Sequence, residues 1–452
     1  MKIENRTGHS VNISDIERNF APKEEVSFYE ISKQELLKSM SLRNLIRSSR
    51  FYPIEIDNES SLEVNLKKES DIVLSMSSSE KEQKNSGVIL RGQFLDYSGY
   101  AKVNRNLAAV IKKNKIPISI NAVDSAHPRL IGSDLVLSSS FTYTNSSFGD
   151  VVIDSVVPSF DSGRGRKKSI LYTTVEAYTV PDSFSKIFDQ YDEIWTTSNF
   201  CKTVISGKTN KPVHVVPGIV DFENYTASGE KFDLHGKAKS FKFISVFNWN
   251  HRKGADALIR AYCQAFSGTD DVSLILVCRK RRVSGPARGV KDEVEKEIAN
   301  VKMANPPHIV RLTKEINEIQ LASLYRSCDA FVLPTRGEGY GLPYLEAGLC
   351  GIPVIGTKVS AVQDILSEDT SLLIDIDGFR KVPENATGCY FWDGQMMADL
   401  TSKDFINRLA EGMRDMVNNY HKYAEKNKAF QNFIYTKCSS HAVFNTVKDL
   451  LP

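Results

Sequence analysis

The sequence contains few cysteines, and none of them is placed for a disulfide framework or a zinc site. Seven cysteines are scattered through 452 residues, and no two of them form a C-x-x-C pair. An odd, dispersed set that lies mostly inside apolar segments is typical of reduced core thiols in a cytoplasmic protein. We therefore expect a cytoplasmic location and no structural zinc ion.

Long apolar runs are also missing. No stretch reaches the roughly 18 apolar residues that a membrane-spanning helix needs. Residues 1–5 do not begin the apolar core that a signal peptide requires, so neither a transmembrane segment nor a leader is expected. A hydrophobic fraction of 41% and a charged fraction of 25% are those of a soluble globular protein.

A strong charge of one sign is absent as well. The net charge of +3 at pH 7 does not by itself indicate a polyanionic partner. Basic residues do gather locally, in residues 164–168 and again in residues 279–288. Solvated loops are the commoner explanation of such runs. The alternative is an acidic acceptor such as a phospholipid, a teichoic-type polymer or nucleic acid.

The length suits two domains plus an extension. Residues 1–85 differ from the rest, because they combine short strand-like pieces, a helical stretch at 32–40 and a polar, serine-rich linker at 75–86. We interpret them as an accessory module, for which acceptor recognition and oligomerisation are equally open. From Gly87 onward apolar strand-like runs alternate with helical patterns, which predicts an α/β fold.

The most informative segment covers residues 331–346. An apolar run ends in Pro334, a glycine-bearing loop with a glutamate follows, and a stretch of helical character carries a second glutamate. Residues 351–356 then bring a break and another buried-strand pattern. The order is strand, loop, helix, strand, which is half of a nucleotide-binding α/β unit.

Several residues of this segment suit a phosphorylated ligand. Gly339 and Gly341 allow close approach of the backbone, and the amides that open the helix near Leu342 are unpaired donors suited to phosphate. Glu338 lies in the loop and Glu346 about one turn inside the helix, so both can face one ligand. The alternative is a buried helix whose glutamates only cap and solvate it.

Together with the surrounding EGYGLPYLEAGLCGIPVIGT, the two glutamates resemble the E-x7-E motif of retaining nucleotide-sugar glycosyltransferases with the GT-B fold, in glycosyltransferase family 4. The resemblance implies two Rossmann-like domains facing a cleft, with the N-terminal accessory module added. It implies that Glu338 contacts the donor sugar and Glu346 holds the ribose hydroxyls. Tyr340, between the two glycines, is then a further donor-binding candidate.

The resemblance covers most of the chain beyond the extension and sets the expected domains. Residues 1–85 form the accessory module and linker, and residues 86–225 the first Rossmann-like domain, which binds the acceptor. Residues 226–430 form the second Rossmann-like domain, which binds the nucleotide-sugar donor. In GT-B enzymes the last helix crosses back onto the first domain, and residues 431–452 are expected to do so.

Two cations, Arg252 and Lys253, follow a strand of the second domain and suit diphosphate oxygens. The family places a lysine just before such a glycine on the diphosphate, which corresponds to Lys253. Its partner arginine often lies about five residues earlier, after a glycine. Those positions hold Asn248 and Phe247 here, which is a departure for which Arg252 is the candidate substitute. A solvated loop before a helix is the alternative.

Neither a cofactor nor a metal ion is expected beside the nucleotide sugar, for which UDP- or GDP-sugars are the leading candidates. The cations at Lys253 and the helix opening at Leu342 would stand in for an ion. A single D-x-D, at Asp375 and Asp377, lies well past Glu346, and a solvated turn is the favoured interpretation. It remains the reason to test for a metal.

The first domain contributes four further candidates. Glu176 follows the strand at residues 169–174, where many family members have a histidine, and is the candidate for sugar or acceptor contact. A loop carboxylate facing solvent is the equal alternative. Gly99 matches the family glycine that approaches the donor phosphates and acceptor. Tyr97 and His127 are candidate acceptor contacts.

Three functions are compatible with these features. The first is a retaining glycosyltransferase that acts on a glycan, lipid or protein acceptor in glycan or surface polysaccharide synthesis, with nucleotide contacts from residues 313–316. The second is a glycosyltransferase that modifies a hydroxymethylated base in phage DNA, which the basic segments suggest. The third is a catalytically silent GT-B scaffold that binds nucleotide or glycan. The sequence does not indicate an oligomeric state.

Overall fold

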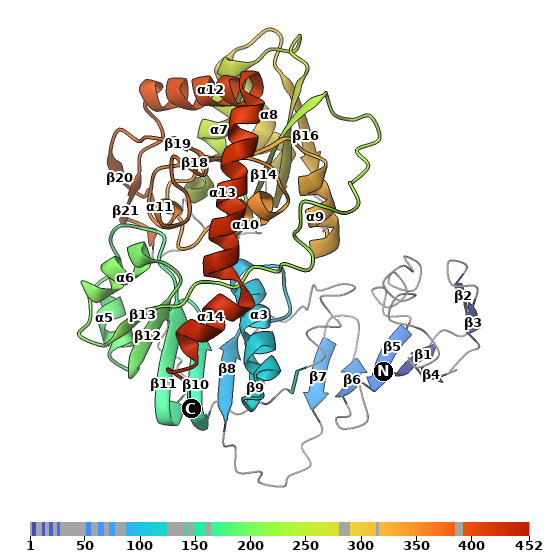
Figure 1. Ribbon diagram of the computed structural model, residues 1–452, viewed down its shortest axis with the longest axis vertical. Coiled ribbons are helices and arrows are strands. Elements are labelled where there is room, and N and C mark those ends of the chain that lie inside the picture. Colours follow the sequence, from blue (N-terminus) through green and yellow to red (C-terminus); the bar gives the residue numbers. More distant parts are fainter. Residues whose placement is uncertain are drawn as a thin grey trace. The chain divides into compact units, whose positions relative to one another are not determined.

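The computed structural model describes the backbone of seven short strands before residue 77, followed by residues 87–123, 141–142, 144, 148–158, 164–279, 290–312, 316–384 and 392–451 (Figure 1). Two compact units make up the chain. One comprises Met1–Val156, Asp161–Ile170 and Leu451–Pro452, and the other comprises Val157–Phe160 and Leu171–Leu450. Within the described residues, no helix has the length and apolar character needed to cross a membrane.

The N-terminal strands pair antiparallel, in contrast with the parallel strands that follow. Strands β1 (Lys2–Asn5), β4 (Glu25–Ser27) and β5 (Phe51–Glu55) form one sheet, in the order β4-β1-β5. Two hairpins accompany it, β2 (Val11–Ile13) with β3 (Arg18–Phe20) and β6 (Leu62–Leu66) with β7 (Ile72–Met76). Two strand-like pieces of the sequence, residues 11–13 and 25–29, contain β2 and β4, and residues 28–29 lie outside the described residues. The expected helix at 32–40 and most of the expected linker lie outside the described residues.

The first large sheet has six strands in the order β13-β12-β11-β10-β8-β9. Its members are β8 (Val88–Gly92), β9 (Ile118–Ala122), β10 (Phe148–Ser155), β11 (Arg164–Thr173), β12 (Glu193–Thr196) and β13 (Val213–Val215). The pairs β8–β9, β8–β10 and β12–β13 run parallel. Helices α5 (Ser183–Phe188) and α6 (Asn199–Ser206) belong to the second unit.

Helix α3 (Gly99–Lys113) follows β8. A capping side chain at its start, basic residues at its end and an apolar face favour the helix. The Ser98 hydroxyl accepts a hydrogen bond from the Ala101 amide and so caps the first turn. Lys112 and Lys113 lie in the last turn, where they interact favourably with the helix dipole. Val103, Leu107 and Val110, which are spaced for one helix face, belong to its buried side.

The second large sheet is parallel throughout, in the order β16-β15-β14-β17-β18-β19. Its strands are β14 (Phe241–Asn248), β15 (Val272–Arg279), β16 (His308–Leu312), β17 (Ala330–Leu333), β18 (Val354–Thr357) and β19 (Leu372–Ile374). Every residue of β17 and β18 is buried. Such continuous burial is expected of strands that helices cover on both faces.

The helices of this part of the chain are α7 (Ala255–Ala265), α8 (Val290–Val301), α9 (Glu318–Arg326), α10 (Leu342–Leu349), α11 (Val362–Ile365), α12 (Lys403–Asn418), α13 (Tyr420–Cys438) and α14 (Ser440–Val447). Helix α12 packs against α7, and α13 packs against α10 (Figure 1). A short hairpin joins β20 (Phe379–Lys381) to β21 (Met396–Ala398). Helices α12, α13 and α14 make up most of the chain after residue 402, and the expected crossing of the last helix to the first domain remains a prediction.

Candidate active site

The strand order of the second sheet marks where a ligand can enter. Strand β14 is the first of this sheet in the chain, and it lies between β15 and β17. The connections from these neighbouring strands therefore diverge at the carboxyl ends of β14 and β17. Open α/β sheets bind ligands at such a point. The loops that begin there, at residues 249–254 and 334–341, are the two that carry the predicted cations and Glu338.

The first loop is a 3-10 turn, η2 (His251–Lys253), which the Asn250 side chain caps by accepting a hydrogen bond from the Lys253 amide at 3.3 Å. Gly254 ends the turn with φ +65°, in the left-handed region. A Cβ at this glycine would lie 1.8 Å from the Pro334 carbonyl oxygen. Only glycine allows the two loops to approach this closely, so Gly254 fixes Lys253 beside the end of β17.

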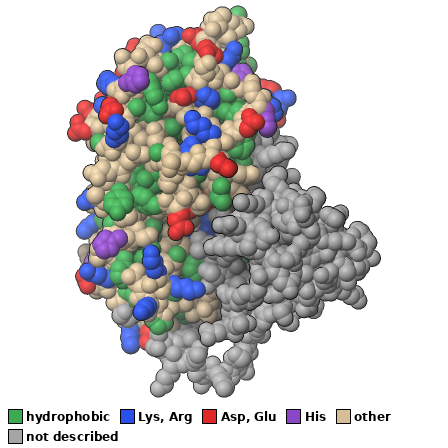
Figure 2. Space-filling view, turned by 45° about the vertical axis from the view of Figure 1, so that its right-hand side comes forward, with side chains coloured by type: hydrophobic (Ala, Val, Ile, Leu, Met, Phe, Trp, Pro, Cys, Tyr) green, Lys and Arg blue, Asp and Glu red, His purple; other side chains and the backbone are tan. Residues whose placement is uncertain are grey.

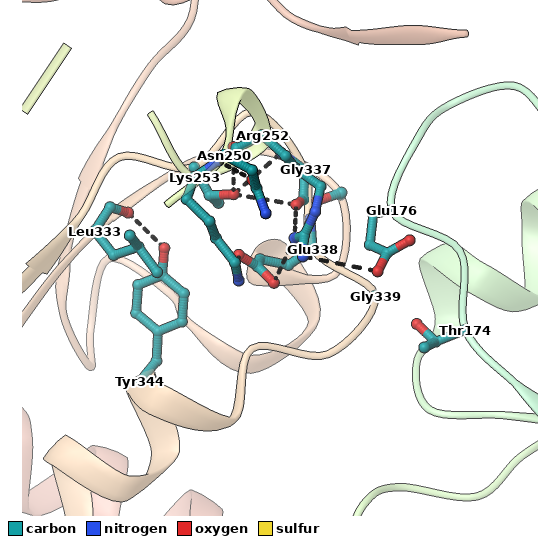
Figure 3. A network of polar contacts seen from close by, with 12 residues as sticks. Thr174, Glu176, Asn250, Arg252, Lys253, Leu333, Gly337, Glu338, Gly339 and Tyr344 are labelled. Atoms are coloured by element: carbon teal, nitrogen blue, oxygen red, sulfur yellow. Dashed lines mark hydrogen bonds and ion pairs between the residues drawn. The ribbon is translucent and has the colours of Figure 1, made fainter. Parts of the chain in front are cut away.

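The second loop brings Glu338 to both cations (Figure 3). Lys253 Nζ lies 2.6 Å from Glu338 Oε1, and Arg252 Nη1 lies 2.9 Å from Glu338 Oε2. Arg252 Nη1 also donates to the Gly337 carbonyl at 2.6 Å. Glu338 is 5% exposed and Lys253 is 9% exposed, so this ion pair is largely shielded from water.

The two cations determine the protonation state of Glu338. Burial alone raises the pKa of Glu338, but Lys253 and Arg252 overcome that effect and lower it to about 2. Burial and the neighbouring Arg252 lower the pKa of Lys253, while Glu338 raises it. At neutral pH Glu338 is therefore a carboxylate that accepts hydrogen bonds from two cations.

Glu176 reaches the same guanidinium from the loop after β11. Its Oε1 lies 3.8 Å from Arg252 Nη2, and its side chain is 18% exposed. Burial raises the pKa of Glu176, partly offset by Arg252. The backbones meet as well, because a Cβ at Gly337 would lie 1.9 Å from the Glu176 carbonyl oxygen. The structure thus places Glu176 beside the two cations and Glu338, and it excludes a fully solvated loop carboxylate.

Gly339 is held by side chains from the segment that follows β12. Its carbonyl oxygen accepts hydrogen bonds from Thr197 Oγ1 at 2.7 Å, Ser198 Oγ at 3.0 Å and Cys201 Sγ at 3.2 Å. A Cβ at Gly339 would lie 1.4 Å from Thr174 Oγ1. Gly339 is therefore needed for close backbone approach, here to the protein itself.

The backbone of Glu338 is fixed on both sides. Its amide donates to Ser360 Oγ at 2.8 Å, and its carbonyl oxygen accepts from the Ala361 amide at 3.2 Å. Ser360 has φ +43°, a strained value for a residue other than glycine. The Ser360 amide donates to the Tyr178 hydroxyl at 2.8 Å, which helps to hold that conformation.

Arg336 joins the two loops and is 1% exposed. Its guanidinium pairs with both carboxylate oxygens of Asp256, at 2.9 and 2.7 Å, and donates to the His251 carbonyl at 2.5 Å. Its amide donates to the Arg252 carbonyl at 2.7 Å. The linear pattern around Arg336 does not distinguish it from a surface arginine, so the sequence did not indicate its role.

Helix α10 begins where the sequence predicts. Gly341, with φ +98°, is its N-cap, and Leu342 opens the first turn. Glu346 is 2% exposed and accepts a hydrogen bond from the Tyr325 hydroxyl at 3.3 Å. Tyr340 is buried, and its hydroxyl donates to the Gly218 carbonyl at 2.7 Å and lies 3.1 Å from Cys438 Sγ. The donor contacts expected of these residues remain predictions.

The remaining candidates belong to the first unit or lie outside the described residues. Tyr97 and Gly99 belong to the first unit, where Gly99 is the first residue of α3. His127 lies outside the described residues, as do residues 313–315 and most of the basic segment at 279–288. The departure at Asn248 is exposed at the end of β14. The roles expected of Tyr97, Gly99 and His127 stay predictions.

The D-x-D carboxylates pair with cations of the chain. Asp375 lies 3.6 Å from Lys358, and Asp377 lies 2.6 Å from Arg408. In the described part of the chain, no group of three or more His, Cys, Asp or Glu residues is placed to hold a metal ion.

On the face drawn in Figure 2, described side chains of both charge signs are interspersed with apolar ones.

Comparison with known proteins places the loops at residues 249–254 and 334–341 within a recognised domain. Residues 238–382 match the family model of glycosyl transferases group 1. The lipopolysaccharide core biosynthesis mannosyltransferase LpsB of Rhizobium meliloti (strain 1021) is 30% identical over 156 residues, which cover 32% of this chain and 40% of that protein. A D-inositol 3-phosphate glycosyltransferase of Arthrobacter sp. (strain FB24) is 28% identical over 167 residues, covering 36% and 38%. The chain thus matches about two fifths of the length of these curated relatives.

Solved structures extend the similarity beyond that domain. Anabaena Alr3699/HepE in complex with UDP-glucose aligns with a TM-score of 0.58 and 13% identity, over 80% of this chain and 99% of that one. Sucrose-phosphate synthase (tll1590) from Thermosynechococcus elongatus aligns with a TM-score of 0.55 and 12% identity, over 81% and 98%. The expected GT-B fold, with two parallel-sheet Rossmann-like domains, is confirmed.

Proposed function

We propose that the chain is a retaining glycosyltransferase, which moves a sugar from a nucleoside-diphosphate sugar to an acceptor hydroxyl. The observation that carries the proposal is the buried constellation of Arg252, Lys253 and Glu338 at the carboxyl ends of β14 and β17. It lies within the segment that matches glycosyl transferases group 1. The E-x7-E resemblance supports retention and the assignment to glycosyltransferase family 4.

Each residue of the constellation suits one part of the donor. Arg252 and Lys253 stabilise the negative charge that develops on the departing diphosphate, in a site where water screens little. Glu338, ionised at neutral pH, accepts hydrogen bonds from sugar hydroxyls. The Leu342 amide at the start of α10 donates to a phosphate oxygen, since Pro343 has no N–H and the Tyr344 amide donates to the Gly341 carbonyl, and Glu346 accepts hydrogen bonds from the ribose hydroxyls.

The acceptor hydroxyl attacks the anomeric carbon on the face from which the diphosphate leaves, and the leaving phosphate takes the acceptor proton. This route needs no strong protein base. Glu176 orients the sugar or the acceptor beside Arg252 and does not form a covalent bond to the sugar. The two cations neutralise the diphosphate, so we propose that transfer is independent of divalent metal.

The donor is proposed to be a UDP- or GDP-hexose, and the acceptor a glycan, lipid or protein of surface polysaccharide synthesis in the cytoplasm. The names of the relatives, among them a mannosyltransferase and a protein in complex with UDP-glucose, support a nucleotide sugar. Modification of DNA rests on basic segments whose side chains lie mostly outside the described residues. The intact Glu338–Lys253 pair argues against a silent scaffold.

The test is release of nucleoside diphosphate from UDP- and GDP-hexoses by the purified chain with glycan acceptors, with EDTA or with Mg²⁺. We expect EDTA to leave the rate unchanged and proton NMR to show that the product keeps the donor's anomeric configuration. Glu338→Ala should remove activity, because it takes away the carboxylate that is proposed to accept hydrogen bonds from the donor sugar. Full activity of that variant, an inverted product or a strict need for Mg²⁺ would each refute the corresponding part of the proposal.

A further inference from the structure

Arg252 and Lys253, the two cations proposed to hold the diphosphate, are already paired with Glu338. Glu338 Oε1 lies 2.6 Å from Lys253 and Glu338 Oε2 lies 2.9 Å from Arg252, so each carboxylate oxygen accepts from one cation. A carboxylate and a phosphate offer these cations the same kind of oxygen acceptor. Both cations have further N–H donors, but a diphosphate must displace Glu338 to take over the contacts through which the carboxylate binds them.

Only the side chain of Glu338 is free to make that exchange. Its amide and carbonyl are tied to Ser360 and Ala361, and the next carbonyl, that of Gly339, accepts three side-chain hydrogen bonds. The backbone thus stays in place while rotation about the side-chain bonds carries the carboxylate away. The displaced carboxylate remains in the site and must find new donors there.

Moving the Glu338 carboxylate away from the two cations is unfavourable in free energy, because of what surrounds it. The side chain is only 6% exposed, so water cannot replace the lost ion pairs fully. Glu176 lies on the other side of Arg252, 3.8 Å from its guanidinium, and repels a second negative charge. The hydroxyl groups of a sugar, by contrast, are neutral donors that can satisfy the carboxylate.

We propose that Glu338 distinguishes an intact nucleotide sugar from a spent nucleoside diphosphate. An intact donor supplies phosphate oxygens to Arg252 and Lys253 and hydroxyl donors to Glu338, so every charge in the site regains a partner. A bare nucleoside diphosphate displaces Glu338 and leaves it without such donors. The site therefore binds the spent nucleotide more weakly, which favours its release after transfer. The inference rests on the proposed function and adds a specificity role for this residue.

The test compares three ligands by isothermal titration calorimetry with the wild type and Glu338→Gln. The ligands are inorganic pyrophosphate, UDP or GDP, and the matching UDP-glucose or GDP-mannose. Glutamine keeps the size of the side chain but removes the charge that competes with phosphate. We expect the variant to bind pyrophosphate and the nucleoside diphosphate at least about tenfold more tightly, a change of about 1.4 kcal/mol. Affinity for the nucleotide sugar should either fall or rise by less than threefold, which is a gain of less than about 0.7 kcal/mol.

Glu318→Gln is the matched control. Glu318 is another buried glutamate of the same unit, and it accepts a hydrogen bond from Tyr225. Its replacement should leave the ratio of the two nucleotide affinities as in the wild type. Glu338→Asp serves if the glutamine variant does not fold, because the shortened side chain reaches the two cations less well and should tighten pyrophosphate binding in the same direction.

The outcomes separate the inference from the proposed function. Unchanged or weaker binding of pyrophosphate and nucleoside diphosphate to Glu338→Gln, with normal binding to the wild type, overturns the inference alone. So does an equal gain for the nucleotide and the nucleotide sugar. The proposed function itself is overturned if the wild type binds no nucleotide sugar. It is also overturned if Lys253→Met binds the nucleotide sugar as tightly as the wild type does.

Discussion

The Lys253 ammonium lies 2.6 Å from the Glu338 carboxylate, although 85 residues separate them in the chain. The sheet order explains the meeting, because β14 and β17 are neighbours and the loops that follow them emerge at the same edge. Gly254 and Gly337 then permit close backbone contacts that keep the loops in place. Lys253 and Glu338 are thus buried together, in contact, at this edge of the sheet.

Replacing Lys253 should reduce donor binding and turnover together. Lys253→Met keeps an unbranched side chain but removes a cation from the diphosphate, so we expect kcat/KM to fall by about 10²- to 10³-fold. The matched control is Lys242→Met, whose lysine pairs with Asp329 at 3.3 Å. Steady-state kinetics with saturating acceptor measures the effect, and unchanged constants for Lys253→Met would move the diphosphate site elsewhere.

Acid should remove the stabilisation that Glu338 provides. Its pKa is lowered from 4.5 to about 2 in the folded chain, so the folded state favours the ionised form. The contribution is fully present above pH 4.5 and is lost as the pH falls through about 2. It amounts to about 3 kcal/mol at most. Urea unfolding of the wild type and Glu338→Gln from pH 6 to pH 2.5 measures it. The advantage of the wild type should shrink toward acid, and a constant difference would contradict the ion pair.

Arg336 should matter for both stability and donor binding. Arg336→Met removes a buried guanidinium that pairs with Asp256 and holds the His251 carbonyl, so we expect a loss of about 3 kcal/mol in the free energy of unfolding. KM for the donor should rise because η2 loses its support. Arg260→Met, at a more exposed ion pair with Glu297, should cost less than about 1 kcal/mol. Equal losses for the two variants would refute the role of Arg336.

Adding one methyl group at Gly339 should disturb the site. The Cβ of Gly339→Ala would lie 1.4 Å from Thr174 Oγ1, so the loop that carries Glu338 must shift, at a cost of about 1 to 3 kcal/mol. Activity should fall more steeply than stability, because Glu338 moves with the loop. Thr174→Gly removes the three side-chain atoms nearest to that Cβ and should restore part of the activity in the double variant. Purely additive effects would contradict the clash.

The sequence predicted the parts of the site that have local signals. The order of strand, loop, helix and strand, the start of α10 at Leu342 and the cations at η2 were all readable from apolar runs, glycines and charges. The sequence offered Glu176 only as an even choice between a site residue and a solvated carboxylate. Its contact with Arg252 joins the loop after β11 to η2, and a contact between segments so far apart in the chain depends on the tertiary structure.

The residues that were missed act across long sequence separations. Ser198 was predictable as a helix cap, but its second hydrogen bond reaches Gly339, 141 residues away. Tyr340 was a donor-binding candidate, which stays a prediction, but nothing in the sequence indicated that its hydroxyl donates to the Gly218 carbonyl, 122 residues away. Propensity and spacing describe neighbours along the chain, whereas these contacts depend on how the sheets and loops are assembled.

The most direct test of the account is a thermal-shift titration of the purified chain with UDP-, GDP-, ADP- and dTDP-sugars, with EDTA present. A ligand that binds only the native state stabilises it by about 2.7 kcal/mol at a hundredfold excess over its dissociation constant. We predict a clear rise in Tm for one nucleotide class, which disappears in Lys253→Met and persists in Lys242→Met. The absence of a shift with every donor, or an equal shift in both variants, would contradict a nucleotide-sugar site built on Lys253 and Glu338.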